Sequence, residues 1–204
     1  IRPDAAAGYA ACEDALYQKP MTASAMRSVV PPMSGNVGAG AGAVVGKLFG
    51  LNRAMKGGIG HALVKVGPWQ VGAMVACNAV GDVIDPANGQ VLAGARTADG
   101  TRLLNTQQAL LAGQSSAIPM AGTNTSIGVV ATNATLNKAQ AKRLAMSAHD
   151  GFARSIRPAH TTLDGDTLFA IATCAETAAP DMLLLTVMAA EATAQATVNA
   201  ILFA

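Results

Sequence analysis

The stretch at residues 121–130, AGTNTSIGVV, most constrains the fold of this chain, because a loop passes there directly into a strand. Residues 122–124, Gly-Thr-Asn, are typical of a flexible loop, and the β-branched apolar run at 127–130 is typical of a buried strand. The pattern predicts a strand over residues 125–132. Thr125 is expected at its first position, with the preceding asparagine on the loop side.

Composition limits how the core is built around this strand. Of the 204 residues, 51% are apolar and only 3% are aromatic, so Ala, Val, Leu, Ile and Met must fill the core. This apolar content is too high for a disordered chain, so the 21 glycines indicate tight turns and close backbone contacts. The length suits one domain with an ample core.

The rest of the chain predicts helices near both ends and strands between them. Helices are expected over residues 5–17, with Asp4 as the N-cap, over 137–154 and over 182–202. Further strands are expected at 59–66, 71–80, 83–84, 90–92 and 167–173, the last of them buried, and a polar loop with a short helix at 107–111 is expected over 96–120. The class is therefore α+β, and a helix–sheet–sheet–helix layering of mostly antiparallel strands suits it.

Charge and cysteine content restrict the partners and the compartment. The net charge is +2, with no basic run and few aromatic residues, which argues against nucleic acid as a partner. The apolar tail at 182–204 contains polar residues, so it predicts a packed helix and no membrane span. Cys12, Cys77 and Cys174 form no CxxC pair, and we expect buried, reduced thiols in a cytoplasmic protein. Because the sequence begins at Ile1 without a methionine, an upstream segment is expected to be missing or processed away.

Thr125 is a candidate nucleophile. A threonine hydroxyl needs a base beside it, and a threonine at a chain N-terminus carries its own, an α-amine with a pKa of about 8. We therefore hypothesise that Oγ1 of Thr125 attacks the carbonyl carbon of Asn124, and that water then separates the resulting ester into two chains. The alternative is an ordinary turn entering a strand. Asn124-Thr125-Ser126 is also a glycosylation sequon, although nothing indicates secretion.

Asp164 and Asp166 form a second candidate feature, in the sequence DGD. In an extended chain both carboxylates leave the same side, and their repulsion should raise one pKa, which suits a site that handles protons. The alternatives are a surface turn or a weak calcium loop. Calcium is disfavoured because no further oxygen ligands follow at loop spacing.

Asn78 and Lys47 complete the set of candidate residues. Asn78 lies in an apolar strand, where its amide could donate to a developing oxyanion or make a structural hydrogen bond. Lys47 ends an apolar run after the Gly/Ala segment 35–43. It could be buried to compensate the carboxylates, or it could lie at the surface. A phosphate loop is excluded because Leu48 follows the lysine.

The three histidines, His61, His149 and His160, have no shared spacing. They predict neither a metal site nor a histidine-based triad, and no cofactor is expected. His160 precedes the two carboxylates by a few residues and could shape the pocket.

The segments TNTSI at 123–127 and HTTLDGDTLFA at 160–170 resemble the N-terminal-nucleophile family of L-aminopeptidase/D-Ala-esterase and β-peptidyl aminopeptidases. Within it the resemblance is closest to the nylon-oligomer (6-aminohexanoate-oligomer) endohydrolases. The segments that contain Lys47 and Asn78 fall in the right order. The resemblance covers essentially the whole chain but only the later part of the family's usual length, so the first strands and helices of the family fold are expected to lie outside these residues.

The resemblance implies a four-layer αββα sandwich, made as one hydrolase domain over residues 1–204. Cleavage would divide it into an α-subunit portion at 1–124 and a β-subunit at 125–204. The implied roles are Thr125 as nucleophile and base, Asn78 as oxyanion donor, Lys47 as the active-site lysine, and Asp164 and Asp166 as the acidic pair. The lysine with two aspartates favours the nylon-hydrolase-like branch. The family's αβ units assemble into homo-oligomers, often with four copies.

Three functions remain open at this point. The leading one is a self-cleaving amide hydrolase that acts on short amide oligomers or peptides with a free amino end. The second is an aminopeptidase or D-amino-acid esterase on the same scaffold. The third, from another class, is a non-catalytic relative that serves binding or assembly, and the joint presence of all five polar candidates argues against it.

Overall fold

The computed structural model describes residues 4–17, 32–117 and 123–204, so the end of the expected polar loop and residues 121–122 lie outside the described residues. Residues 1–33 and 34–204 form separate compact units. The first unit contains helix α1 (Ala5–Tyr17), which has the predicted bounds. Its N-cap is also confirmed, because a carboxylate oxygen of Asp4 accepts the N–H of Ala7 at 2.9 Å.

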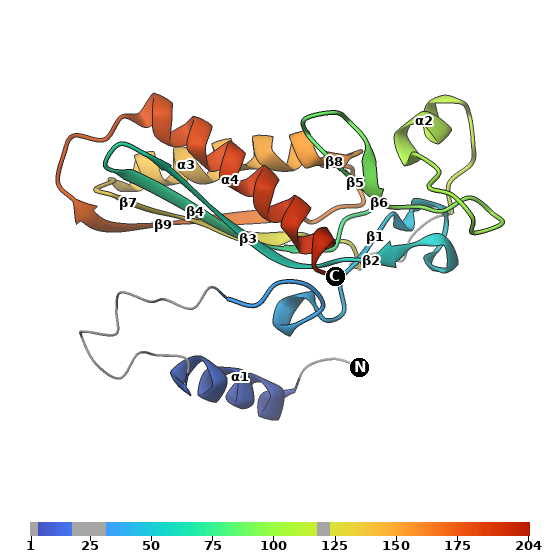
Figure 1. Ribbon diagram of the computed structural model, residues 1–204, viewed down its shortest axis with the longest axis horizontal. Helices are drawn as coiled ribbons and strands as arrows, with labels where there is room; N and C mark the ends of the chain where they lie inside the picture. Colours follow the sequence, from blue (N-terminus) through green and yellow to red (C-terminus); the bar gives the residue numbers. More distant parts are fainter. Residues whose placement is uncertain (1–3, 18–31, 118–122) are drawn as a thin grey trace. The chain divides into compact units, whose positions relative to one another are not determined.

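A four-stranded sheet is the centre of the second unit (Figure 1). Its strand order is β3 (Gly58–Val66), β4 (Trp69–Cys77), β7 (Ile127–Ala134) and β9 (Thr167–Glu176). The first two pairs are antiparallel and the β7–β9 pair is parallel. Strands form at each expected place, and the expected α+β class is confirmed. However, β4 ends at Cys77, so the prediction that Asn78 lies inside a strand over residues 71–80 is wrong. The Asn78 N–H donates to the Ser126 hydroxyl and not to a strand neighbour.

Helices α3 (Lys138–Ser155) and α4 (Met182–Leu202) cover one face of this sheet (Figure 1). Asn137 begins α3 with a capping box, in which its side chain accepts the N–H of Gln140 and the Gln140 side chain accepts the N–H of Asn137. The alternate residues of the strands that point to this face pack with the helices in the main core, which includes the fully buried Leu144 and Phe152. The 3.6-residue period predicted from the sequence therefore produces this packing.

The opposite face of the sheet is open and apolar among the described residues. Ile127, Phe169 and Ile171 are each more than half exposed there. The prediction that the strand at 167–173 is buried is therefore wrong. Strand β9 lies at the sheet edge, and only the side chains that alternate toward α3 and α4 lose contact with water.

The second unit also contains a smaller sheet, a two-stranded ladder and several short helical elements. A three-stranded sheet contains β6 (Val91–Ala93), β5 (Asp82–Ile84) and β8 (Ile156–Arg157), and the predicted short helix is α2 (Thr106–Leu111). A small ladder pairs β1 (Val44–Val45) with β2 (Met55–Lys56), and three 3₁₀ turns, Gly38–Gly40, Lys47–Phe49 and Leu51–Arg53, lie around it.

Helix α4 approaches strand β3 so closely that only glycine fits at Gly60. A Cβ at this position would lie 2.2 Å from backbone atoms of Ala196 and Ala200. We expect Gly60→Ala to lower the free energy of unfolding by about 2 kcal/mol, because the backbone of a packed helix must move. Gly72→Ala is the matched control, because a Cβ there meets its nearest atoms at an ordinary 3.6 Å. Denaturant unfolding of both variants measures the difference, and equal stability would contradict the close contact.

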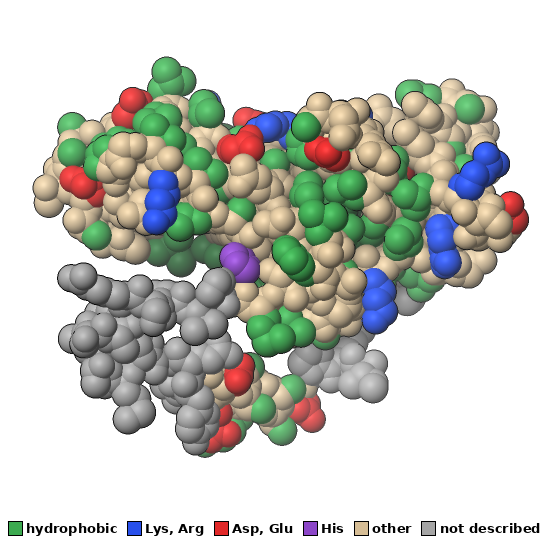
Figure 2. All heavy atoms as spheres, in the orientation of Figure 1, with side chains coloured by type: hydrophobic (Ala, Val, Ile, Leu, Met, Phe, Trp, Pro, Cys, Tyr) green, Lys and Arg blue, Asp and Glu red, His purple; other side chains and the backbone are tan. Residues whose placement is uncertain are grey.

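The exposure of the cysteines and the distribution of charged side chains describe the surface of the chain. Cys77 is buried, but Cys12 and Cys174 are exposed, so the expectation of three buried thiols is wrong for two of them. All three are free thiols. Over residues 34–204, charged side chains of both signs are scattered across the face shown in Figure 2, and hydrophobic ones gather in its middle. None of the described helices combines the length and the apolar composition needed to cross a bilayer.

Candidate active site

The peptide bond between Asn124 and Thr125 lies just before the sheet. Strand β7 begins at Ile127, so the prediction that Thr125 is the first strand residue is wrong by two positions. The ladder with β9 begins by pairing Ile127 with Thr167, which leaves Thr125 beside the turn that precedes β9. The carbonyl oxygen of Asn124 accepts the N–H of Gly165 at 2.9 Å. The bond thus has a fixed orientation, with a hydrogen-bond donor already on its oxygen.

Lys47 and Asn78 hold the next carbonyl along the chain. Lys47 is only 3% exposed, and its Nζ donates to the carbonyl oxygen of Thr123 at 2.9 Å. The side-chain amide of Asn78 donates to the same oxygen at 3.0 Å. Nζ of Lys47 also contacts the carbonyl oxygen and Oδ1 of Asn78, each at 2.9 Å. Two donors that converge on one carbonyl oxygen form the geometry that an oxyanion requires.

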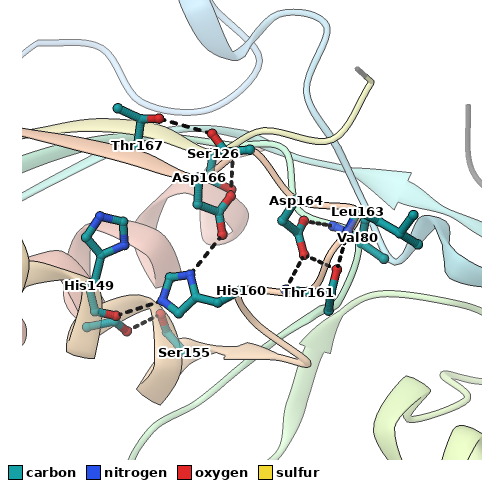
Figure 3. A network of polar contacts seen from close by, with 12 residues as sticks. Val80, Ser126, His149, Ser155, His160, Thr161, Leu163, Asp164, Asp166 and Thr167 are labelled. Atoms are coloured by element: carbon teal, nitrogen blue, oxygen red, sulfur yellow. Dashed lines mark hydrogen bonds and ion pairs between the residues drawn. The ribbon is translucent and has the colours of Figure 1, made fainter. Parts of the chain in front are cut away.

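The two carboxylates have separate partners, although only Gly165 lies between them (Figure 3). Oδ1 of Asp166 accepts the N–H of Ser126 at 2.8 Å. Oδ1 of Asp164 accepts the N–H of Val80 at 3.1 Å, and its Oδ2 accepts the Thr161 hydroxyl at 2.7 Å. The structure thus shows which backbone segment each carboxylate contacts. Asp166 accepts a backbone hydrogen bond from Ser126, the residue after Thr125. Asp164 accepts one from Val80, in the loop after Asn78.

Burial controls the electrostatics of the site. It lowers the pKa of Lys47 to about 8, against the opposing charges of Asp164, Cys77 and Asp166. Burial also raises the pKa of Asp166, and the neighbouring charge of Asp164 raises it further. The buried thiol of Cys77 has its pKa raised to about 12, mainly by burial, so it is not a nucleophile at neutral pH.

A cavity of about 500 Å³ opens beside the peptide bond on the open face of the sheet. Asn78 and Thr125 are the polar residues of its wall, and the rest of the lining is glycine, alanine and larger apolar side chains such as Met74 and Phe169. No charged side chain belongs to the lining among the described residues. The cavity therefore suits an uncharged, largely apolar chain.

All the candidate residues predicted from the sequence thus lie around one peptide bond, and the structure adds three that were missed. The N–H of Gly165 donates to the Asn124 carbonyl oxygen, and the N–H of Ser126 donates to Asp166. The hydroxyl of Thr161 donates to Asp164. A Cβ on Gly165 would lie 2.8 Å from Oγ1 of Thr125, so the glycine between the two aspartates was the available signal.

The histidines lie in different places. The His61 ring contacts the Ser34 hydroxyl at 3.0 Å, and the His149 ring lies next to that of His160, tilted by 55° with 5.1 Å between the centroids. Nδ1 of His160 lies 3.6 Å from Oδ2 of Asp166. Within the described ranges, no three His, Cys, Asp or Glu side chains converge as a metal site would require.

Comparison with known proteins finds one matching family, peptidase family S58, over residues 7–204. The chain is 45% identical over 175 residues to an uncharacterized aminopeptidase of Mycobacterium leprae, covering 84% of this chain and 44% of that protein. It is 33% identical over 171 residues to a 6-aminohexanoate-oligomer endohydrolase of Kocuria sp., covering 81% and 47%. The chain thus spans about half the length of the curated relatives that it matches.

Solved structures show the same relationship at the level of the fold. The L-aminopeptidase D-Ala-esterase/amidase of Ochrobactrum anthropi, a variant of the Ntn-hydrolase fold, matches with a TM-score of 0.57 and 24% identity, over 87% of this chain and 47% of that one. A β-aminopeptidase of Burkholderia sp. matches with a TM-score of 0.54 and 28% identity, over 85% and 47%. The chain shares this α+β fold, as expected from its sequence.

Proposed function

The chain belongs to peptidase family S58, and on that premise we propose that it is a self-cleaving amide hydrolase whose nucleophile is Thr125. One observation carries the proposal. The Asn124–Thr125 bond lies at the wall of an apolar cavity, with Gly165 N–H on its carbonyl oxygen and the Lys47–Asn78 pair on the preceding carbonyl. A turn that only enters a strand has no need of a buried lysine at this place.

Self-cleavage proceeds in two steps in this proposal. Oγ1 of Thr125 attacks the carbonyl carbon of Asn124, and the negative charge on that oxygen is stabilised by the Gly165 N–H. The C–O bond forms first and gives a tetrahedral intermediate. When the intermediate collapses, the C–N bond breaks and the hydroxyl proton passes to the departing nitrogen. Water then hydrolyses the ester, which leaves a carboxyl group on Asn124 and both a hydroxyl and an amine on Thr125. The products are residues 1–124 and 125–204.

Turnover of a substrate uses the same residues, but Thr125 now has a free α-amine, and Lys47 and Asn78 bind the carbonyl of the substrate. The new α-amine of Thr125 takes the proton from Oγ1, because its pKa of about 8 suits a base near neutral pH. Lys47 and Asn78 hold a carbonyl oxygen in the uncut chain, that of Thr123. When this segment withdraws after cleavage, the same two donors are free for the carbonyl of a substrate.

The cavity wall favours a substrate with an uncharged acyl chain, such as a 6-aminohexanoate oligomer. This agrees with the relatives that are named 6-aminohexanoate-oligomer endohydrolases. A second candidate is an aminopeptidase acting on L- or β-amino-acid amides. The 45% and 40% identities to mycobacterial proteins named uncharacterized aminopeptidases favour it. Homo-oligomers of αβ units and a cytoplasmic location, which the free thiols suit, remain part of the proposal.

Intact-mass analysis and N-terminal sequencing of the purified protein test this function. We expect two fragments, with Thr125 as the new N-terminus, and an acylating probe should form a covalent adduct on the fragment that begins with Thr125. Rates on a 6-aminohexanoate oligomer, a β-alanyl amide and an L-alanyl amide then rank the two candidate activities. A single uncut chain without an adduct would favour the binding or assembly relative instead.

A further inference from the structure

The Asp166 carboxylate has one oxygen toward Ser126 and the other toward His160 (Figure 3). Oδ1 accepts the N–H of Ser126, the residue after Thr125. Oδ2 is buried and accepts no hydrogen bond from the described residues, and its nearest ionisable neighbour is Nδ1 of His160 at 3.6 Å. A buried carboxylate oxygen without a donor is costly, so the histidine beside it calls for a physical explanation.

The backbone conformation of His160 and its contacts with His149 and Phe152 fix the orientation of its ring. Its backbone has a φ of 54°, a left-handed conformation that residues other than glycine and asparagine rarely adopt. The ring centroid lies 5.1 Å from that of His149 and 6.4 Å from that of Phe152. Nε2 lies 3.4 Å from the carbonyl oxygen of His149. These contacts direct Nδ1 toward Asp166.

The proton count of this pair follows from its geometry. The His149 carbonyl can only accept, so Nε2 of His160 must carry a hydrogen to make that contact. In a neutral ring, Nδ1 is then a lone pair, and it faces the lone pairs of a carboxylate oxygen. Two acceptors in this position are favourable only if one proton lies between them.

We propose that His160 is a positioning residue whose protonated ring forms an ion pair through Nδ1 with Oδ2 of Asp166, and so fixes Asp166 in the orientation in which Oδ1 holds the N–H of Ser126, next to the nucleophile. The inference rests on the proposed self-cleavage. Because the His160 side chain is 40% exposed while that of Asp166 is 3% exposed, the proton exchanges with solvent at the histidine.

Neighbouring groups act on this pair in known directions. Burial and the charge of Asp164 raise the pKa of Asp166, which helps the pair to keep its proton. Burial and then the charge of His160 lower the pKa of His149, so the neighbouring ring does not compete for it. Lys47, whose pKa is lowered by burial to about 8, and Cys77, whose pKa is raised by burial, also face the site, so all rates are compared at one pH.

Two substitutions that accept a left-handed backbone separate the roles of His160. Asparagine places an amide N–H where Nδ1 lies but does not titrate, and glycine removes the donor. We expect His160→Gly to slow self-cleavage about tenfold near pH 6, and His160→Asn to restore most of the rate. His61→Gln is the control histidine substitution.

The outcomes distinguish this inference from the proposed function. If the wild type is cut but His160→Gly matches its rate, or if Asn and Gly are equally slow, the positioning role is overturned and self-cleavage stands. If the wild type stays uncut, imidazole ¹⁵N resonances of His160 still test the pair. We expect the second ring proton of His160 to be held more strongly in Thr125→Val, where Asp166 faces Nδ1, than in Thr125→Val/Asp166→Asn. Identical titrations in the two proteins would overturn the ion pair.

Discussion

Thr125→Val is expected to leave the chain in one piece. Valine nearly keeps the shape of threonine but has no hydroxyl, so no atom remains at this position to attack the Asn124 carbonyl carbon. We expect first-order cleavage to slow by at least about a thousandfold, with the fold and the free energy of unfolding nearly unchanged. Thr125→Ser keeps the hydroxyl and should restore cleavage. Time courses on denaturing gels with intact masses give the rates.

Ser126→Ala controls for the adjacent hydroxyl. The Ser126 hydroxyl accepts the N–H of Asn78 at 3.3 Å and also interacts with Asp166, where it partly offsets the rise in pKa caused by burial, but the Ser126 N–H that Asp166 accepts at 2.8 Å is retained by alanine. This variant should therefore be cut within about fivefold of the wild-type rate. If Thr125→Val were cut between residues 125 and 126 while Ser126→Ala was not cut, Ser126 would be the nucleophile.

The same residues show why much of this fold follows from sequence. Asn137 and Gln140 specify the start of α3, and the apolar period of three to four residues predicts the face that packs on the sheet. These signals are local. The exposure of Phe169 and Ile171 is not local, because it depends on which strand occupies the sheet edge, and an apolar run reads the same in the centre and at the edge.

For the candidate site, the sequence suggested the residues but not the contacts between them. Residue type suggested Lys47, Asn78, Asp164 and Asp166, because a buried cation, an amide in an apolar strand and paired carboxylates each need an explanation. Their partners could not be predicted, since each contact joins segments far apart in the chain. Val80 N–H to Asp164 and Lys47 to Thr123 are examples.

Gly165 is the residue that sequence reasoning passed over, because a glycine has no side chain to suggest chemistry. The structure gives it two properties. Its N–H donates to the Asn124 carbonyl oxygen, and the space where a Cβ would lie is next to Oγ1 of Thr125. Its backbone is not in the left-handed region, so alanine meets no conformational penalty there.

Gly165→Ala is therefore expected to separate stability from cleavage. The added Cβ would lie 2.8 Å from Oγ1 of Thr125, and the short threonine side chain can relieve this contact by rotating. Rotation costs little stability, so the free energy of unfolding should change by less than about 1 kcal/mol. It moves the attacking oxygen away from the carbonyl carbon, and a displacement of this size slows a reaction about a hundredfold.

Gly72→Ala supplies the same substitution away from the site, where a Cβ makes only ordinary contacts. It should be cut at the wild-type rate. Rates from gel time courses, compared with unfolding midpoints in urea, show whether the effect is one of alignment. If Gly165→Ala lost stability and cleavage together, its effect would be a general loosening of the turn. If Gly165→Ala were cut as fast as Gly72→Ala, the position of Oγ1 next to Gly165 would not be the position from which it attacks. The contacts of the uncut chain would then differ from those at the moment of attack.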